Sequence, residues 1–323
     1  MRLGIIGYGY TGKQHARALE QIDSASLAGV AETSPERRSE CTVKSFDDYR
    51  ALLDDPTIDA VTVCLPHSAH QPIASAALKA DKHVLVEKPL ALTVEAGEQL
   101  CELAKRNSLV LMVEMTHRFM PPVVEARELI SKGLIGNVLA VDDLLLENVG
   151  LFGSLPSWMF KRAEAGGGVG LTSGVHLLDH VSWLTGQNLS LESACFGYSQ
   201  GMGNVEDTAA FFLRLENGAP VHIALSWRPG GPGIEGELRI FGEKGTLVVQ
   251  PWNGWKLRGT DEEKENVSFS SQATIAERAL VGMRGALSEF VRAVQEGREP
   301  DPRPELALRS QRIIEQAYRM FSS

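Results

Sequence analysis

The sequence predicts an α/β protein with two domains, a parallel sheet in the first and largely antiparallel strands in the second. The chain has 323 residues, a length typical of two domains. Short apolar runs alternate with helical patterns in the N-terminal part, which is typical of a parallel sheet. Later apolar segments are joined by tight turns, which is typical of antiparallel pairing. We place the first domain at residues 1–118 and the second at residues 119–323, and packing of the C-terminal helices on the first domain is left open.

Five apolar runs predict the strands of the first domain. The run from Ala60 to Leu65 is nearly continuous, as expected for a strand covered on both faces. The expected strands are Leu3–Ile6, Leu27–Ala31, Ala60–Leu65, His83–Val86 and Leu109–Val113, and the expected helices are Thr11–Glu20, His70–Lys79 and Val94–Arg106.

The pattern changes after Pro121-Pro122. Asn217-Gly218 predicts a hairpin between two apolar runs, and residues 242–245 predict a second tight turn. The polar segment 261–272 is expected to be a mobile excursion. The expected strands are Val138–Leu146, Ala209–Leu215, Val221–Trp227, Glu237–Phe241 and Thr246–Val249, and the expected helices are Val123–Ser131, Thr172–Leu184, Arg284–Glu296 and Glu305–Phe321.

Composition excludes several classes of protein. The net charge of −9 argues against binding of nucleic acid, which requires clustered cations. Four cysteines without a C-x-x-C pair favour reduced thiols and a cytoplasmic location. We find no signal peptide and no apolar run near the ~20 residues of a membrane helix, so no membrane partner is expected.

A glycine-rich turn, Gly7-Tyr8-Gly9-Tyr10-Thr11-Gly12, follows the first strand and opens a helix. Glu32 ends the second strand, 20 residues after Gly12, and this spacing predicts binding of a dinucleotide. The turn supplies amides and helix dipole to a pyrophosphate, and Glu32 accepts hydrogen bonds from a ribose. The alternative is a structural glycine turn without a ligand. The expected contacts in this region are Gly7, Tyr8, Gly9, Tyr10, Thr11, Gly12, Glu32, Thr33 and Arg37.

Glu32 favours NAD, because a carboxylate repels the 2′-phosphate of NADP. Arg37 and Arg38 lie one turn beyond and could meet that phosphate, so NADP stays possible. The alternative reading of both arginines is solvated charge at the start of a helix.

Glu87-Lys88-Pro89 follows the strand His83–Val86, at the sheet edge where ligands bind. A lysine there can hydrogen-bond a substrate oxygen, and burial would lower its pKa toward the range of proton transfer. The alternative is a lysine paired with Glu87 at the start of a helix.

Several segments together resemble the glucose-fructose oxidoreductase, inositol dehydrogenase and MocA family. The segment 83–89, with Glu87-Lys88-Pro89, is the most specific. The other matching segments, in the family's order, are 7–12, 59–66 with His70, Arg118-Phe119 with Pro121, 133–136, and 166–168 leading to 174–179. The resemblance extends from the N-terminus to about residue 180.

This resemblance implies an N-terminal Rossmann domain with a parallel sheet and a C-terminal α/β domain with a large, mostly antiparallel sheet. It implies that Lys88 and His176 are the catalytic pair, and it allows a cis Lys88–Pro89 bond. It also implies a homodimer or homotetramer that packs through the sheet of the second domain. Further cofactor contacts are expected at Leu65, Pro66, His67, His70, Glu87 and Lys88, although a plain loop at Pro66-His67 is the alternative.

The segment around His176 departs from the family pattern. Many relatives carry aspartate four residues before the histidine, where this chain has Thr172. Thr172, His176 and Asp179 are spaced to share one face of the expected helix, and we include Thr172 among the catalytic candidates. Threonine can hydrogen-bond but cannot hold a charge. His176, Asp179 and His180 also resemble a metal site weakly, and no metal is expected.

The remaining candidates are residues that could contact substrate. They are Arg118, Trp158 and Asp179, together with His176. Arg118 could instead form a surface ion pair with Glu114 or Glu125, and Trp158 could belong to the core. His15 is interpreted as structural.

The expected function is transfer of a hydride between a nicotinamide cofactor and a sugar, inositol or related polyol or keto-sugar. His176 would take the hydroxyl proton while Lys88 hydrogen-bonds the developing oxyanion. One alternative is an NAD-dependent glycosidase or lyase that oxidises its substrate only transiently, and another is a non-catalytic nucleotide-sensing protein.

Overall fold

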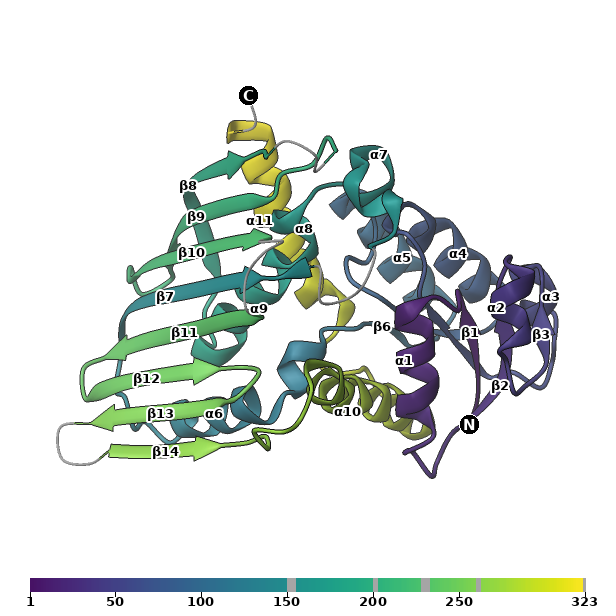
Figure 1. Cartoon of the computed structure of the whole chain (residues 1–323), viewed down its shortest axis with the longest axis horizontal. Helices are drawn as coiled ribbons and strands as arrows, with labels where there is room; N and C mark the ends of the chain where they lie inside the picture. The colour runs from purple at the N-terminus through teal and green to yellow at the C-terminus, as the bar shows by residue number, and fades with distance from the viewer. Residues whose placement is uncertain (150–154, 200–202, 228–232, 260–262, 322–323) are drawn as a thin grey trace. The chain divides into compact units, whose positions relative to one another are not determined.

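The computed structural model describes residues 1–149, 155–199, 203–227, 233–259 and 263–321. The chain forms two compact units (Figure 1). The first unit contains residues 1–116 and 280–309, and the second contains residues 117–279 and 310–323. Residues 280–309 therefore return to the first unit, although they are distant from it in sequence.

The first unit is built on a six-stranded parallel sheet with the order β3-β2-β1-β4-β5-β6. β1 pairs with both β2 and β4, so the direction of strand progression reverses at β1. Ligands of open α/β sheets bind outside the carboxyl ends of the strands at such a switch point. The strands are β1 (Arg2–Ile6), β2 (Ser26–Ala31), β3 (Ser45–Phe46), β4 (Ala60–Val63), β5 (His83–Val86) and β6 (Leu111–Val113).

The five strands expected in this region are confirmed. β3 is additional, and its two residues are too few to produce an apolar run. The helices connecting the strands are α1 (Tyr10–Leu19), α2 (Pro35–Ser39), α3 (Tyr49–Leu53), α4 (His67–Lys79) and α5 (Val94–Arg106). The side chains of Ser34, Asp48 and Thr93 cap α2, α3 and α5, which explains where these three helices begin. α4 begins three residues earlier than expected, at His67.

The second unit is built on an eight-stranded sheet with the order β14-β13-β12-β11-β7-β10-β9-β8 (Figure 1). β7 and β10 pair in parallel, and all other neighbours pair antiparallel, which confirms the expected character of this sheet. The strands are β7 (Val138–Glu147), β8 (Leu189–Gly197), β9 (Thr208–Leu215), β10 (Pro220–Trp227), β11 (Ile234–Gly242), β12 (Gly245–Gln250), β13 (Gly254–Gly259) and β14 (Glu263–Val267).

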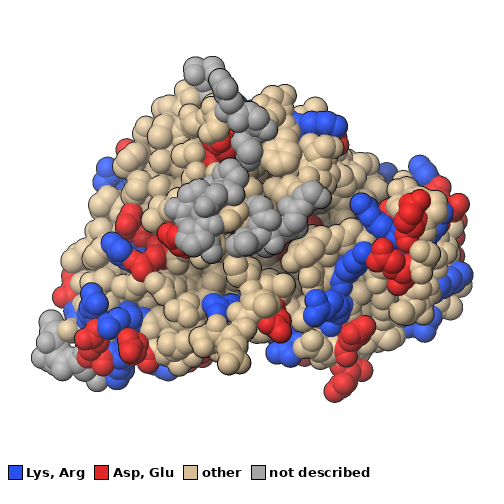
Figure 2. Space-filling view, viewed as in Figure 1, with Lys and Arg blue, Asp and Glu red and all other residues tan. Residues whose placement is uncertain are grey.

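The two expected hairpins form as β9–β10 and β11–β12. In the first, Gly218 has φ +89°, which a residue with a side chain rarely adopts, and the Asn217 side chain accepts from the Ala219 amide at 3.0 Å. The expectation of a mobile excursion over residues 261–272 is wrong where β14 pairs with β13. β14 pairs with β13 through its backbone, and all five of its side chains are exposed. Figure 2 shows acidic and basic side chains gathered over these strands, where Lys256 and Arg258 pair with Glu263.

Helices cover one face of this sheet. α8 contacts β9 and β10, α9 contacts β7 and β10, and α6 contacts β12 and β13. The helical segments that follow β6 in the chain, including α10 with most of its residues in the first unit, are η1 (Thr116–Phe119), α6 (Pro121–Ser131), η3 (Ser157–Phe160), α7 (Arg162–Ala165), α8 (Val169–Thr172), α9 (Gly174–Thr185), α10 (Ile275–Glu296) and α11 (Pro304–Phe321). Among the residues that the structure describes, no helix combines the length and apolar character of a membrane span.

The helix expected over Thr172–Leu184 is wrong at its start. Thr172 is the last residue of α8, and a separate helix, α9, begins at Gly174. α8 is anchored by its own contact, in which the amides of Gly168 and Gly170 donate to the buried Glu206 carboxylate at 2.8 and 3.1 Å. Thr172 and His176 therefore belong to two separate helices, although Ser173 between them keeps right-handed helical dihedral angles, φ −107° and ψ −34°.

Candidate active site

The glycine-rich turn lies between β1 and α1. Gly7 has φ +94°, and a Cβ atom there would lie 2.3 Å from the Cys64 carbonyl oxygen. A Cβ atom on Gly12 would lie 2.0 Å from the Gly7 oxygen, so both glycines are required by the turn itself. Gly9 differs, because its Cβ position has no neighbour closer than 4.0 Å. The open space at Gly9, beside the N-terminus of the ten-residue helix α1, is the kind of approach that a phosphate group needs.

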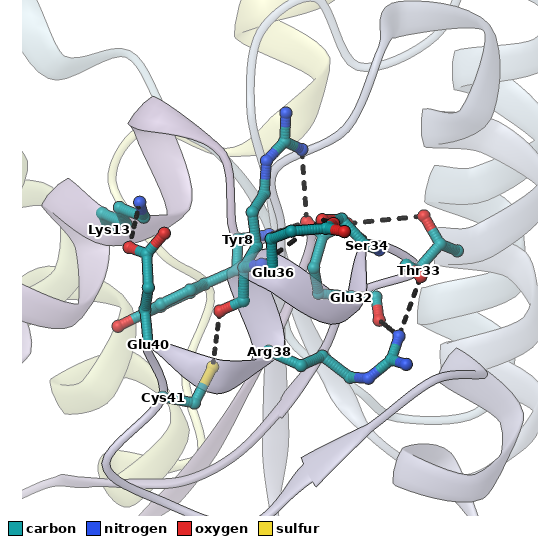
Figure 3. A network of polar contacts seen from close by, with 10 residues as sticks. Tyr8, Lys13, Glu32, Thr33, Ser34, Glu36, Arg38, Glu40 and Cys41 are labelled. Atoms are coloured by element: carbon teal, nitrogen blue, oxygen red, sulfur yellow. Dashed lines mark hydrogen bonds and ion pairs between the residues drawn. The ribbon is translucent and has the colours of Figure 1, made fainter.

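Glu32 follows β2 and faces this turn (Figure 3). Its carboxylate is buried and accepts hydrogen bonds from the amides of Tyr8 at 2.8 Å and Ser34 at 2.9 Å. Burial favours the neutral acid, but these two amides and the Arg37 guanidinium outweigh it and lower the pKa of Glu32. An ionised carboxylate is therefore held at the end of β2.

The two neighbouring arginines differ in their contacts. Arg38 donates to the backbone oxygens of Glu32 and Thr33 at 2.6 and 2.8 Å (Figure 3). The side chain of Arg37 is 53% exposed, and its guanidinium lies 3.5 Å from Glu32. To bind a phosphate group, either arginine would have to give up its contact with the Glu32 segment.

The two tyrosines of the turn also differ. Tyr8 packs against the small apolar cluster of Ile5, Ala16 and Val30, whereas Tyr10 is half exposed at the start of α1. Thr11 lies in the first turn of α1, and the Thr33 hydroxyl donates to the Glu32 carboxylate at 3.4 Å.

The carboxyl ends of β4 and β5 bring together the next group of candidates. His70 on α4 is fully buried, with Nδ1 2.7 Å from the Pro89 oxygen and Nε2 2.9 Å from the Leu65 oxygen. Burial lowers the pKa of His70 in spite of these two carbonyls. The neutral ring carries a single N–H, so it donates to one of these two carbonyl oxygens while it lies between the segments after β4 and β5. His67, also expected to contact cofactor, is the first residue of α4, and its ring centroid lies 5.5 Å from that of His70.

Lys88 lies in the turn after β5, and its amide donates to the Glu87 carboxylate at 3.2 Å. The Lys88–Pro89 bond is cis, as the resemblance allows. Glu87 also approaches His15 of α1, with Oε1 3.4 Å from Nε2. Burial opposes the charge of Glu87, but His15 and Lys88 lower its pKa.

In the second unit, His176 lies on α9 and belongs to a layer of buried rings. Its imidazole stacks on that of His117, with centroids 4.1 Å apart and planes at 13°. His117 also stacks on His180, at 5.0 Å, and meets the edge of Trp252 at 5.3 Å. The sequence interpretation missed His117, and the only available signal was its position beside Arg118.

Arg118 and Asp179, both predicted to contact substrate, contact each other. Two guanidinium nitrogens donate to the two carboxylate oxygens at 2.6 Å each, and both side chains are at least 95% buried. The alternative of a surface ion pair with Glu114 or Glu125 is wrong. The pair joins η1 to α9 and so connects the segments that carry His117 and His176.

Two further titratable groups are buried near this pair. His180 lies on α9, and burial together with Arg118 lowers its pKa to about 3. Its Nδ1 is 4.0 Å from Asp143 of β7, whose pKa is raised well above the usual value by burial and by Asp142. Thr172 is also buried, whereas Trp158 of η3 is half-buried.

Comparison with known proteins identifies both parts of the chain. Residues 1–115 match the oxidoreductase family with an NAD-binding Rossmann fold, and residues 123–248 match the GFO/IDH/MocA C-terminal domain. The chain is 31% identical to levoglucosan dehydrogenase of Pseudarthrobacter phenanthrenivorans, over 77% of this chain and 73% of the relative. It is 26% identical to myo-inositol 2-dehydrogenase of Thermotoga maritima, over 93% and 90%.

Solved structures share the fold. A levoglucosan dehydrogenase in complex with NADH and levoglucosan superposes with a TM-score of 0.84, at 24% identity, over 99% of this chain and 97% of that one. GenD2 from gentamicin A biosynthesis, in complex with NAD, has a TM-score of 0.86 at 23% identity, over 100% and 94%. With both of its domains matched, the chain belongs to the GFO/IDH/MocA family of oxidoreductases, whose first domain is an NAD-binding Rossmann fold.

Proposed function

We propose that this protein transfers a hydride between NAD and a hydroxyl-bearing carbon of a sugar, inositol or related polyol. The observation that supports this most strongly lies within the first unit. The Gly7–Gly12 turn, the Glu32 carboxylate and Lys88 all follow strands of one parallel sheet at its carboxyl edge. That edge is where sheets of this kind bind dinucleotides and their reaction partners.

The residues at this edge fit NAD. The space at Gly9 and the amides of α1 suit a pyrophosphate, and the ionised Glu32 suits a ribose with free hydroxyls. When bound, the nicotinamide ring supplies the position that accepts or returns a hydride. The same carboxylate disfavours a 2′-phosphate, which supports NAD over NADP. Contacts from Tyr8, Tyr10, Thr11, Thr33 and Arg37 stay predictions.

Lys88 and His176 are the proposed catalytic residues. His176 accepts the proton of the substrate hydroxyl, and the Lys88 ammonium donates a hydrogen bond to the oxygen as negative charge develops. The stack with His117 restricts rotation of the His176 ring and thereby orients its nitrogens. Thr172 can contribute a hydroxyl but no charge, so the proton passes to His176 without a carboxylate at that position.

Arg118 and Asp179 serve this site by positioning. Each satisfies the other in a buried, bidentate pair, and together they hold η1 and α9 in the arrangement that stacks His117 on His176. Direct contact of Arg118, Asp179 or Trp158 with substrate stays a prediction.

The names of the relatives support the substrate class. They refer to levoglucosan, myo-inositol and, for a reductase of Ensifer adhaerens 28% identical to this chain, 1,5-anhydro-D-fructose. All three are cyclic compounds rich in hydroxyl groups, which supports a substrate of that class.

We also propose that the protein is a cytoplasmic homodimer or homotetramer that associates through the second sheet. The face of this sheet opposite the helices exposes Leu144, Phe212 and Phe241. Phe212 and His222 are cross-strand neighbours, with ring centroids 5.0 Å apart. An exposed apolar sheet face of this kind favours association. Four free cysteines fit a reducing compartment.

A panel of polyols, sugars and keto-sugars with NAD and NADP, followed by nicotinamide absorbance, tests the proposal. We expect turnover with NAD, and a loss of about 10²–10⁴ in kcat for Lys88→Ala and for His176→Ala with NADH binding retained in a fluorescence titration. Lys105→Ala, an exposed lysine on α5, is the matched control. Near-normal turnover in both variants would reject these roles. Product without net NADH would favour transient oxidation, and NADH binding without turnover on any substrate would favour a sensing role.

A further inference from the structure

Three polar residues lie along one side of α9. Ser173, His176 and His180 are spaced i, i+3 and i+7, and Ser173, at the start of the helix, already has right-handed helical dihedral angles. Residues with this spacing share one face of a helix. The His117 ring stacks on both His176 and His180, so these two rings lie on the same side of α9. The three side chains therefore form a polar stripe along the helix.

One face of β7 lies against this polar stripe. Asp143 and Glu147 are four residues apart on the strand, so alternation of side chains places them on the same face. Two contacts show that this face is directed toward α9. Asp143 Oδ2 lies 4.0 Å from His180 Nδ1, and the Ser173 hydroxyl donates to Glu147 Oε2 at 2.5 Å. One carboxyl group therefore meets each end of the stripe, and His176 lies between these two ends along α9.

The two carboxyl groups differ in their surroundings. Asp143 is buried, and burial together with Asp142 raises the pKa of Asp143 well above its usual value, which favours the neutral acid. Glu147 is half-buried at the end of β7, and it accepts a hydrogen bond from Ser173. A half-buried carboxylate keeps part of its hydration, so a negative charge costs less at Glu147 than at Asp143. Glu147 is therefore the member of the two that is suited to carry a charge.

The other charged groups around α9 are directed to other partners. Asp179 forms the bidentate pair with Arg118, and Arg127 of α6 stacks on Trp183. The Glu206 carboxylate accepts from the amides of α8, and the buried side chains of β10 are apolar. The titratable and charged groups that belong to α9 or face it from the described elements packed against it are His117 and Arg118 of η1, Arg127 of α6, Asp143 and Glu147 of β7, and His176, Asp179 and His180 of α9 itself.

The proposed reaction places a positive charge on His176. The ring becomes an imidazolium when it accepts the proton of the substrate hydroxyl, and His176 is only 6% exposed. Burial opposes this charge, as it does at the neighbouring His180, where Arg118 opposes it as well. A carboxylate about one helical turn away favours the charge.

We propose that Glu147 is a positioning residue for the reaction, in that its carboxylate, held by the Ser173 hydroxyl at the start of α9, stabilises the imidazolium that His176 becomes when it takes the substrate proton. This inference rests on the proposed function, in which His176 is the base. Thr172 holds no charge, so the negative charge near the start of α9 comes from the sheet and not from the helix.

Glu147→Gln tests this role, because it keeps an acceptor for Ser173 and removes the charge. A unit charge at roughly 8 Å, with an effective dielectric constant of about 20, moves the titration midpoint of an imidazole by about one pH unit. Without the carboxylate, His176 should stay neutral to lower pH. The acid limb of the kcat/KM profile for alcohol oxidation should therefore move down by about one pH unit.

His176 is also followed without turnover, by exchange of its imidazole Cε1 hydrogen for deuterium across pH. Mass spectrometry of the peptide, with fragment ions that separate His176 from His180, gives the midpoint of each ring. The His176 midpoint should fall by the same amount in Glu147→Gln, and Glu147→Asp, which keeps the charge, should shift it less. Asp143→Asn replaces a neutral acid by a neutral amide and should leave the midpoint unchanged. Glu192→Gln, on the exposed side of β8, is the matched control for loss of one negative charge.

Ser173→Ala provides a second variant, because it removes the hydroxyl that holds the carboxylate in place. The His176 midpoint should move in the same direction as in Glu147→Gln, by a smaller amount. An unchanged midpoint in either of these two variants, an equal shift in Glu147→Asp, or a shift in Asp143→Asn as large as in Glu147→Gln would each overturn the inference. Because deuterium exchange needs no substrate, a protein that is inactive on every polyol but shows the expected shift would refute the proposed function alone.

Discussion

Replacing Asp179 by asparagine tests the buried pair that connects η1 to α9. The substitution keeps the size and shape of the side chain and removes its charge. The Arg118 guanidinium, 95% buried, then loses the carboxylate that accepts two of its hydrogen bonds at 2.6 Å. The wild-type contact with the Trp183 ring, 5.5 Å from the guanidinium carbon, does not replace a counter-charge.

The expected cost is about 3–5 kcal/mol in the free energy of unfolding, because a charge stays buried after its partner is removed. Replacing both members, as Arg118→Met with Asp179→Leu, removes the two desolvation penalties together. The double variant should therefore lie within about 1–2 kcal/mol of the parent and be more stable than Asp179→Asn.

The sequence offers a selective assay for this measurement. All five tryptophans lie in the second unit, at positions 158, 183, 227, 252 and 255. Denaturant unfolding followed by tryptophan fluorescence therefore reports the unit that contains the pair, and far-UV circular dichroism reports both units. Two probes are needed because the two units can unfold separately.

Glu192→Gln is the matched control, since Glu192 pairs with Arg214 on the surface with about half of each side chain exposed. Its cost should not exceed about 1 kcal/mol. A cost for Asp179→Asn as small as that of this control, or a double variant less stable than Asp179→Asn, would refute the reasoning.

Two further predictions concern cofactor choice and pH. Glu32→Gln retains an acceptor for the Tyr8 amide but removes the negative charge. The ratio of kcat/KM with NAD to kcat/KM with NADP should therefore fall about tenfold. An unchanged ratio would show that Glu32 does not select the cofactor. His180 has a pKa of about 3 in the folded protein and about 6.5 in the unfolded chain. Below pH 6.5 the unfolded chain binds this proton more readily than the folded protein does. The free energy of unfolding is therefore fully retained above pH 6.5 and decreases as the pH falls toward 3. Between pH 7 and 5 the free energy of unfolding of the second unit should decrease by about 2 kcal/mol through His180. His180→Leu should lack this decrease. If unfolding of the parent and of the variant depends equally on pH, the prediction is contradicted.

Local sequence was sufficient for most of the elements. Continuous apolar runs such as Ala60–Leu65 predict buried parallel strands because both faces of such a strand are covered. Asn217-Gly218 predicts a hairpin because its backbone conformation is local. The glycine turn and Glu32 are also local signals, since the residues that form them lie within two neighbouring strands and the connecting helix.

β14 and the break after Thr172 could not be predicted in this way. β14 has no apolar pattern, and it forms because β13 offers an unpaired backbone edge. α8 is held at its start by Glu206, 34 residues after Thr172, a contact that the local sequence does not reveal. In both places a contact with another segment of the chain accompanies a feature that has no local sequence signal.

For the candidate site, too, some features follow from contiguous sequence and others from tertiary contacts. The sequence by itself identified the residue types, because glycine turns, Glu87-Lys88-Pro89 and the segment around His176 are contiguous motifs. Only the tertiary structure decided their partners. Arg118 meets Asp179 across 61 positions, and His15 meets Glu114 across 99, through strand register and helix packing. Whether a buried charge is stabilised or costly depends on which group lies within a few ångströms of it, and that distance is set by the fold rather than by the order of residues.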